Sequence, residues 1–159
     1  GKIQLVSPQL RAAGQPALPV YTPPLEPPLG YFRLLYGRTA AQTFGRTANN
    51  RQLGELSHGD RVWINARVGR SLGLTDGAYV RLTNQDQVQS ARVQVKLTER
   101  IRADCVYLPH GWGHTSRGLH YAQGKGADDS ELITRVEVCP AMGGTGMRGN
   151  FVAIHREEA

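Results

Sequence analysis

Short apolar runs separated by glycine and polar residues dominate the sequence from Tyr31 onward. This rhythm is typical of β-strands, because few stretches are long enough for a helix of three turns. The pattern predicts strands at residues 31–36, 61–65, 78–83, 88–97, 104–108, 132–138 and 150–154. Short strands with turn signals between them favour a barrel or a sandwich.

One predicted strand and one predicted helix have clear local signals. Between Arg92 and Leu97 polar and apolar residues alternate, so one face of this strand is expected to be buried and the other wet. The strongest prediction of a short helix is at residues 66–72. Asn65 is expected to be its N-cap, and Gly73 is expected to end it.

Residues 56–65 and 74–83 are similar to each other, since each places a glycine turn before a strand. Units made of a turn and a strand all look alike, so this similarity is compatible with chance and with an internal pseudo-symmetry. The two interpretations stay open on the pattern alone.

The first 30 residues differ from the rest in composition. They hold seven of the nine prolines, which fix the backbone and remove hydrogen-bond donors, so residues 1–30 are predicted to be an extended lead-in to one domain at residues 31–159. A linker on the domain surface and a proline-motif ligand are both compatible with this composition. Because the sequence starts with Gly1 rather than Met, we expect a piece of a longer or processed protein.

Length and composition exclude several classes of protein. A chain of 159 residues that is 40% hydrophobic can build the core of one domain, and it contains no run of about 18 apolar residues that would insert directly into a membrane. Two cysteines cannot form a disulfide scaffold. The net charge of +6 favours anionic partners without naming one.

The sequence predicts no catalytic residue and no metal ligand. The glycine pattern at residues 144–149 is followed by the apolar run 151–154, which predicts a strand where a Rossmann motif requires a helix. His110 and His114 are four residues apart, but the glycines between them disfavour the helix that would make them a zinc pair. No nucleophile motif is present.

Three polar, glycine-containing loops are candidates for ligand binding. We call them the first loop (residues 37–50), the second loop (residues 110–114) and the third loop (residues 124–130). Residues 37–50 are rich in hydroxyl, amide and guanidinium groups, as a phosphate- and ring-binding loop requires. In the loop 110–114, Trp112 either stacks on a flat ligand or packs inside the protein. In the loop 124–130, the paired carboxylates either do acid–base work, accept from a guanine edge, or cap a turn.

In their order, these loops resemble the C-terminal domain of the DMSO reductase family of molybdenum and tungsten oxidoreductases, which binds molybdopterin guanine dinucleotide. The resemblance covers roughly the whole chain. The matching segments are residues 1–5, 37–39, 46–50, 62–65, 72–80, 111–114 and 150–152. Gln42 and Ala66 depart from the family pattern, which commonly has histidine and proline there, and Gln42 weighs against a histidine contact to the pterin from the first loop.

The resemblance implies a mainly β fold, a double-psi β-barrel like that of aspartate decarboxylase, with short helices. The pseudo-twofold symmetry of that barrel would explain the internal similarity. It also implies that molybdenum or tungsten is held by other domains, so that neither Cys105 nor Cys139 is a metal ligand. The chain would then hold the cofactor, and the isolated chain is not expected to be active.

The narrower resemblance of residues 46–50 and 110–114 is to catalytic subunits that reduce polysulfide, thiosulfate, tetrathionate or arsenic oxyanions. The expected partners are the remaining domains of the parent catalytic subunit and an iron–sulfur electron-transfer subunit. A periplasmic location is expected for the parent.

Flat pterin and guanine rings and anionic pyrophosphates require amide, hydroxyl and guanidinium groups at fixed positions. From the residues present in the three loops, and from Asn150 near the end of the chain, we predict ten cofactor-binding side chains. They are Thr39, Gln42, Thr43, Thr47, Asn49, Trp112, His114, Asp128, Asp129 and Asn150.

Two other functions fit parts of the sequence. A basic β-barrel that binds nucleic acid agrees with the charge, but the strands lack the interleaved aromatic and basic residues of a stacking platform. A self-processing decarboxylase with the same barrel would need a Gly-Ser cleavage site, and that dipeptide does not occur.

Overall fold

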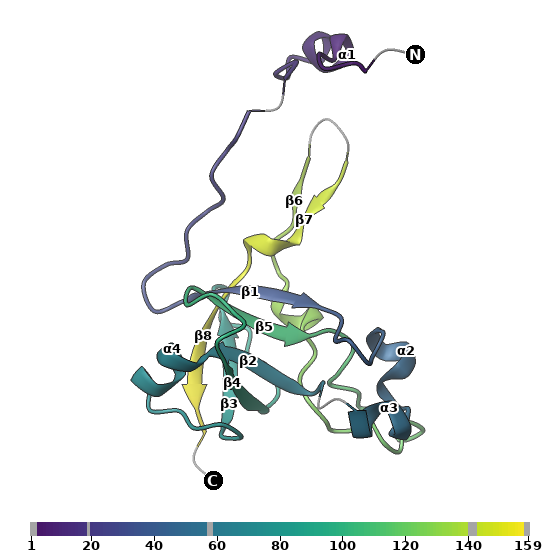
Figure 1. The fold of residues 1–159 in the computed structure, drawn as a ribbon, viewed down its shortest axis with the longest axis vertical. Helices are drawn as coiled ribbons and strands as arrows, with labels where there is room; N and C mark the ends of the chain where they lie inside the picture. The colour runs from purple at the N-terminus through teal and green to yellow at the C-terminus, as the bar shows by residue number, and fades with distance from the viewer. Residues whose placement is uncertain (1–2, 19, 57–58, 140–142, 158–159) are drawn as a thin grey trace.

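A closed barrel of six strands forms the centre of the computed structural model, which describes residues 3–18, 20–56, 59–139 and 143–157 (Figure 1). The strands follow one another around the barrel in the order β1–β5–β2–β4–β3–β8. Their bounds are Phe32–Gly37 (β1), Arg61–Asn65 (β2), Tyr79–Asn84 (β3), Val93–Thr98 (β4), Cys105–Pro109 (β5) and Phe151–Arg156 (β8). The prediction of a mainly β barrel is confirmed.

The strand pairing has a twofold pattern. β1 runs parallel to β5 and β2 runs parallel to β4, while the other neighbours in the barrel are antiparallel. Exchanging β1, β2 and β3 with β4, β5 and β8 reproduces every pairing, so the symmetry partner of β2 is β5. The similarity between residues 56–65 and 74–83 links β2 with β3 instead, so pseudo-symmetry does not explain it. Residues 57 and 58 of that repeat lie outside the described residues.

Alternating side chains of the six strands fill the barrel. In β2, Val62 and Ile64 are fully buried, and in β4 the predicted alternation places Val93 and Val95 inside. Leu82 of β3 is also fully buried in this cluster. Burying each such side chain contributes roughly 1.5–3 kcal/mol, so the barrel has its own hydrophobic core.

The predicted helix after β2 is confirmed as α4, Ala66–Ser71. Asn65 Oδ1 accepts from the backbone N–H groups of Arg67 and Val68 at 3.1 and 3.4 Å, as an N-cap does. The same side chain donates to the carbonyl of Ile101 at 2.9 Å. The cap therefore also fixes the helix to the segment that precedes β5.

The predicted strand at residues 132–138 is wrong. Ser130–Leu132 form a 3₁₀ turn (η1), and only β6, Glu137–Val138, is a strand, paired with β7, Thr145–Gly146, in a hairpin outside the barrel. Side chains bind the backbone at the end of η1 and in the segment that follows it. Asn84 Nδ2 donates to the Leu132 carbonyl, and Asn150 Oδ1 accepts from the N–H groups of residues 134 and 135, so these groups are not available to a sheet.

The predicted strand at residues 88–97 begins only at Val93, because a turn and an isolated bridge between Thr83 and Gln89 precede it. Gln87, within that turn, has φ of 64°, which a strand does not allow.

Short helices occur in segments that the sequence pattern leaves as extended chain or loop. α1, Pro8–Ala12, lies in the proline-rich lead-in; α2, Phe44–Ala48, lies in the first polar loop, and α3, Arg51–Leu56, follows it. A second short 3₁₀ turn, η2, Met147–Gly149, precedes β8. The lead-in and the β6–β7 hairpin extend away from the barrel (Figure 1). No helix in the described part of the chain is long and apolar enough to cross a membrane.

Candidate functional site

The three polar loops of the sequence analysis come together at one end of the barrel. β1 and β5 are parallel neighbours whose last residues, Gly37 and Pro109, are in register, so the loops that follow them leave the barrel side by side. The backbone N–H of His110 donates to the Gly37 carbonyl at 2.9 Å. The first loop and α2 then fold beside the second loop, on one side of the barrel (Figure 1).

Two glycines of the second loop allow the three loops to approach closely. Gly111 has φ of +94°, and a Cβ there would lie 2.2 Å from the backbone nitrogen of Gly45 in the first loop. Gly113 has φ of +82°, and a Cβ there would lie 2.4 Å from the backbone nitrogen of Asp128 in the third loop. Any other residue would strain the backbone and separate the loops.

Three of the predicted side chains have buried polar atoms without a hydrogen-bond partner among the described residues: Thr39 Oγ1, Gln42 Oε1 and Nε2, and His114 Nε2. Leaving a buried polar atom unpaired costs roughly 1–3 kcal/mol, so such atoms are uncommon in a folded domain. Their concentration in two neighbouring loops is the pattern expected of a site that a polar ligand completes.

Gln42 and Trp112 lie together beside Gly59. A Cβ on Gly59 would be 2.2 Å from Gln42 Oε1 and 3.1 Å from the indole nitrogen of Trp112. Trp112 is 6% exposed and packs against Ala48 and Ala122. Of the two roles proposed for Trp112, the structure therefore supports packing inside the protein, where it joins the first and second loops.

Three predicted residues of the first loop hold the loop's own structure. Thr47 Oγ1 accepts from the backbone N–H of Thr43 at 2.6 Å. Asn49 Oδ1 accepts from the backbone N–H groups of Tyr121 and Ala122 at 2.9 and 3.1 Å. These bonds shape the loop around α2 and attach it to the segment that follows the second loop.

The structure does not bring Asn150 to the other predicted residues. It is fully buried and precedes β8 beside the start of β1, whereas the three loops lie beyond the end of β1. Its Oδ1 accepts from Gln85, Thr134 and Arg135, and its Nδ2 donates to two carbonyls. Both polar atoms of its side chain are therefore used within the protein.

In the third loop the two carboxylates differ. Asp128 Oδ1 accepts from the backbone N–H and the hydroxyl of Ser130, so Asp128 caps the turn. Asp129 is fully buried, and both its oxygens contact His110 Nδ1, at 2.8 and 2.9 Å. Burial raises the pKa of Asp129, while the hydrogen bonds from His110 act in the opposite direction.

His110 was missed by the sequence analysis as a site residue. Its place in the motif His-Gly-Trp-Gly-His drew attention to His114 and Trp112, and Asp129, its partner, is 19 residues away. Two residues so far apart produce no local pattern in the sequence. The only available signal was that one loop contains a histidine and another contains a carboxylate.

Comparison with known proteins identifies this arrangement. A family model described as the molydopterin dinucleotide binding domain matches residues 32–157. The chain belongs to this family. The three loops that meet at one end of the barrel all lie inside the matched region of this molydopterin dinucleotide binding domain.

Two larger proteins contain a similar domain. The chain is 26% identical over 128 residues to the arsenate respiratory reductase molybdopterin-containing subunit of Chrysiogenes arsenatis, over 77% of this chain and 15% of the relative. Its fold is similar to acetylene hydratase from Pelobacter acetylenicus, with a TM-score of 0.73 and 16% identity, over 97% of this chain and 23% of that one. The chain thus spans less than a quarter of either protein. The predicted resemblance to the cofactor-binding domain of the DMSO reductase family, and the double-psi barrel it implies, are confirmed.

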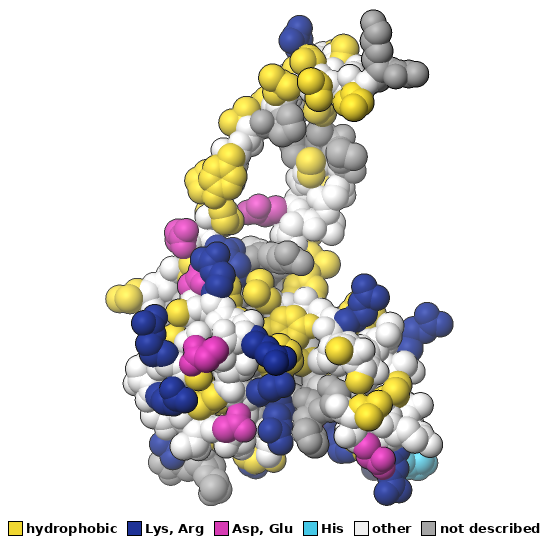
Figure 2. Space-filling view, viewed as in Figure 1, with side chains coloured by type: hydrophobic (Ala, Val, Ile, Leu, Met, Phe, Trp, Pro, Cys, Tyr) yellow, Lys and Arg dark blue, Asp and Glu magenta, His cyan; other side chains and the backbone are white. Residues whose placement is uncertain are grey.

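The residues present fit a molybdopterin-type dinucleotide. The unpaired atoms of Thr39, Gln42 and His114 offer donors and acceptors for a polar ring. The first loop carries Arg38 and Arg46 and no carboxylate, which suits an anionic pyrophosphate. On the face shown in Figure 2, Lys and Arg side chains form a column down the middle of the domain.

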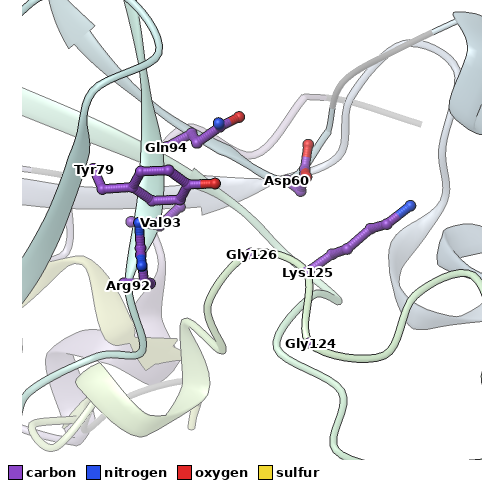
Figure 3. A pocket seen from close by; sticks show the side chains of 8 residues that line it. All are labelled: Asp60, Tyr79, Arg92, Val93, Gln94, Gly124, Lys125 and Gly126. Carbon is purple, nitrogen blue, oxygen red and sulfur yellow. The ribbon is translucent and has the colours of Figure 1, made fainter. Parts of the chain in front are cut away.

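Two pockets border the loops. One, of about 230 Å³, lies beside Arg38 and Thr39 and is lined on its other side by Trp63, Arg100 and Tyr107. The other, of about 270 Å³, lies between β3–β4 and the third loop (Figure 3). It contains none of the predicted residues. Its arginine, Arg92, stacks on a tyrosine ring at 3.7 Å.

Proposed function

We propose that this chain is the part of a larger molybdenum or tungsten oxidoreductase subunit that closes over molybdopterin guanine dinucleotide. The observation that carries the proposal is the set of unpaired buried polar atoms of Thr39, Gln42 and His114 where the first two loops meet. Family membership supports the dinucleotide as the ligand, and the guanine form is our proposal.

The residues of this chain would bind and orient the cofactor. Thr39, Gln42 and His114 would supply hydrogen bonds to its rings, and Arg38 and Arg46 would neutralise its phosphates. Asn49, Thr47 and the two loop glycines would hold these groups in place. The cofactor, with its metal held by other domains, would supply the redox chemistry.

For the parent enzyme we propose reduction of an arsenic or sulfur oxyanion or of polysulfide. Similarity to the arsenate respiratory reductase subunit supports an oxyanion substrate. We further propose an iron–sulfur electron-transfer partner and a periplasmic location. An upstream sequence without an iron–sulfur cysteine motif would contradict the proposed parent enzyme, and one without a twin-arginine signal would contradict the periplasmic location.

A pair of isosteric substitutions tests the cofactor site. Thr39→Val and Thr83→Val each remove a buried hydroxyl that has no partner among the described residues, but Thr83 lies in β3, away from the loops. We expect neither change to lower stability, because an unsatisfied polar atom is replaced by a methyl group.

In the full-length subunit, produced with limiting molybdate, Thr39→Val should lower the content of pterin and metal per polypeptide, and Thr83→Val should not. A cofactor content that is equal in the two variants would contradict the assignment of the first loop to the cofactor.

A further inference from the structure

His110, in the second loop, also contacts the first and third loops of the site. Its backbone N–H is bound to Gly37 at the start of the first loop, and its ring meets the edge of Phe44 of α2 with the centroids 4.7 Å apart. Its Nδ1 reaches Asp129 of the third loop. The imidazole is therefore held between the ring of Phe44 and the carboxylate of Asp129.

The contact with Asp129 determines which ring nitrogen carries hydrogen. Nδ1 lies at nearly equal distances, 2.8 and 2.9 Å, from the two carboxylate oxygens, which is the geometry of one N–H donated between two acceptors. Asp129 is fully buried and accepts no other side-chain hydrogen bond among the described residues. A buried carboxylate requires hydrogen-bond donors, so the contact favours hydrogen on Nδ1.

In a neutral ring with hydrogen on Nδ1, the second nitrogen is left as an acceptor. The His110 side chain is 39% exposed, and in the described ranges its Nε2 has no hydrogen-bond partner. A neutral imidazole with hydrogen on Nδ1 accepts at Nε2 and cannot donate there. Phosphate oxygens are acceptors only, so they do not match this nitrogen.

We propose that His110, oriented by Asp129, binds the cofactor through Nε2 by accepting a hydrogen bond from an N–H group of its pterin or guanine ring. Asp129 acts as a positioning residue that selects the tautomer. This inference rests on the proposed function, because it takes the ring system of the dinucleotide as the donor.

The tautomer is tested first, on the 159-residue chain, by ¹⁵N-detected NMR of the histidine rings. The His110→Asn spectrum identifies the His110 signals by their absence. We expect wild-type signals of a neutral ring with hydrogen on Nδ1, and in Asp129→Asn a transfer of hydrogen to Nε2, because the asparagine amide can donate to Nδ1. A wild-type ring protonated on Nε2 would overturn the proposal, since that nitrogen would then match a phosphate.

Binding is tested in the full-length subunit produced with limiting molybdate. His110→Asn keeps an amide donor near Asp129 but lacks the distal nitrogen, so we expect roughly fivefold lower retention of pterin and metal, the effect of one neutral hydrogen bond. The matched control is His155→Asn, which replaces an exposed histidine of β8 and should retain the wild-type content. His110→Gln, which places an amide oxygen farther along the side chain, should restore part of the content.

The outcomes separate this inference from the proposed function. If Thr39→Val lowers the cofactor content and His110→Asn does not, the role of His110 is wrong and the cofactor site stands. If neither variant differs from the Thr83→Val and His155→Asn controls, both proposals are wrong.

Discussion

Replacing Gly111 by alanine tests whether the close packing of the loops builds the site. Gly111 has φ of +94°, where a Cβ costs roughly 1–2 kcal/mol of backbone strain. The same Cβ would lie 2.2 Å from the backbone nitrogen of Gly45, and because backbone cannot rotate away as a side chain can, overpacking adds about 1–3 kcal/mol. The expected loss of stability is about 2–5 kcal/mol.

Gly77→Ala provides the matched control. Gly77 has φ of +81° and lies in the turn before β3, where a Cβ would meet nothing within 4 Å. It should therefore lose only the backbone strain, about 1–2 kcal/mol. Urea unfolding of the two variants measures the difference, which isolates the clash between the first and second loops.

Tryptophan fluorescence shows where the damage occurs. In a Trp63→Phe background, Trp112 is the only tryptophan, and it is 6% exposed next to Gly111. We expect Gly111→Ala to shift its emission to the red and Gly77→Ala to leave the emission unchanged. Equal stability losses in the two variants, with no change in emission, would refute the account of how the loops pack.

Three further predictions concern the core, the pH dependence and the isolated chain. Leu82→Ala, in the barrel core, should cost about 2–5 kcal/mol in urea unfolding, whereas Leu72→Ala, at an exposed site, should cost less than about 1 kcal/mol. Hydrogen bonds from Arg135 and then Thr134 lower the pKa of Asp86, so its ionised form stabilises the fold above the unfolded pKa near 4, and this contribution is lost as the pH falls. Asp86→Asn should therefore be less stable than wild type at pH 7, and the difference should be clearly smaller at pH 2, as measured by thermal unfolding; a difference of the same size at both values would contradict this. The isolated chain should fold, bind the dinucleotide weakly and show no reductase activity with a viologen dye, and detectable activity would overturn that expectation.

Local patterns in the sequence were sufficient to predict most of the barrel. The alternation around Val93 and Val95 reflects a strand with one buried face, and Asn65 caps α4 through residues two and three positions away. Such features depend on neighbours in the sequence, which a single sequence displays. The composition of residues 37–50 likewise indicated a binding loop, and the structure places it beside the other two loops.

The errors have long-range causes. The segment 132–138 alternates like a strand, but Asn84 and Asn150, each distant in sequence, bind its backbone. The pairing of His110 with Asp129 and the attachment of Asn49 to the backbone of Tyr121 also join distant residues. α2 and α3 have five and six residues, too few for a helical period to stand out.

The place of β8 in the barrel has a consequence for biosynthesis. β8 lies between β1 and β3, so a nascent chain that has not yet emerged from the ribosome as far as Arg156 exposes an unpaired edge on each of those strands. The barrel therefore cannot close step by step during translation. Nearly the whole domain has to be synthesised before β8 is available to complete it. We expect ribosome-bound intermediates that end before Phe151 to be sensitive to protease and to depend on chaperones.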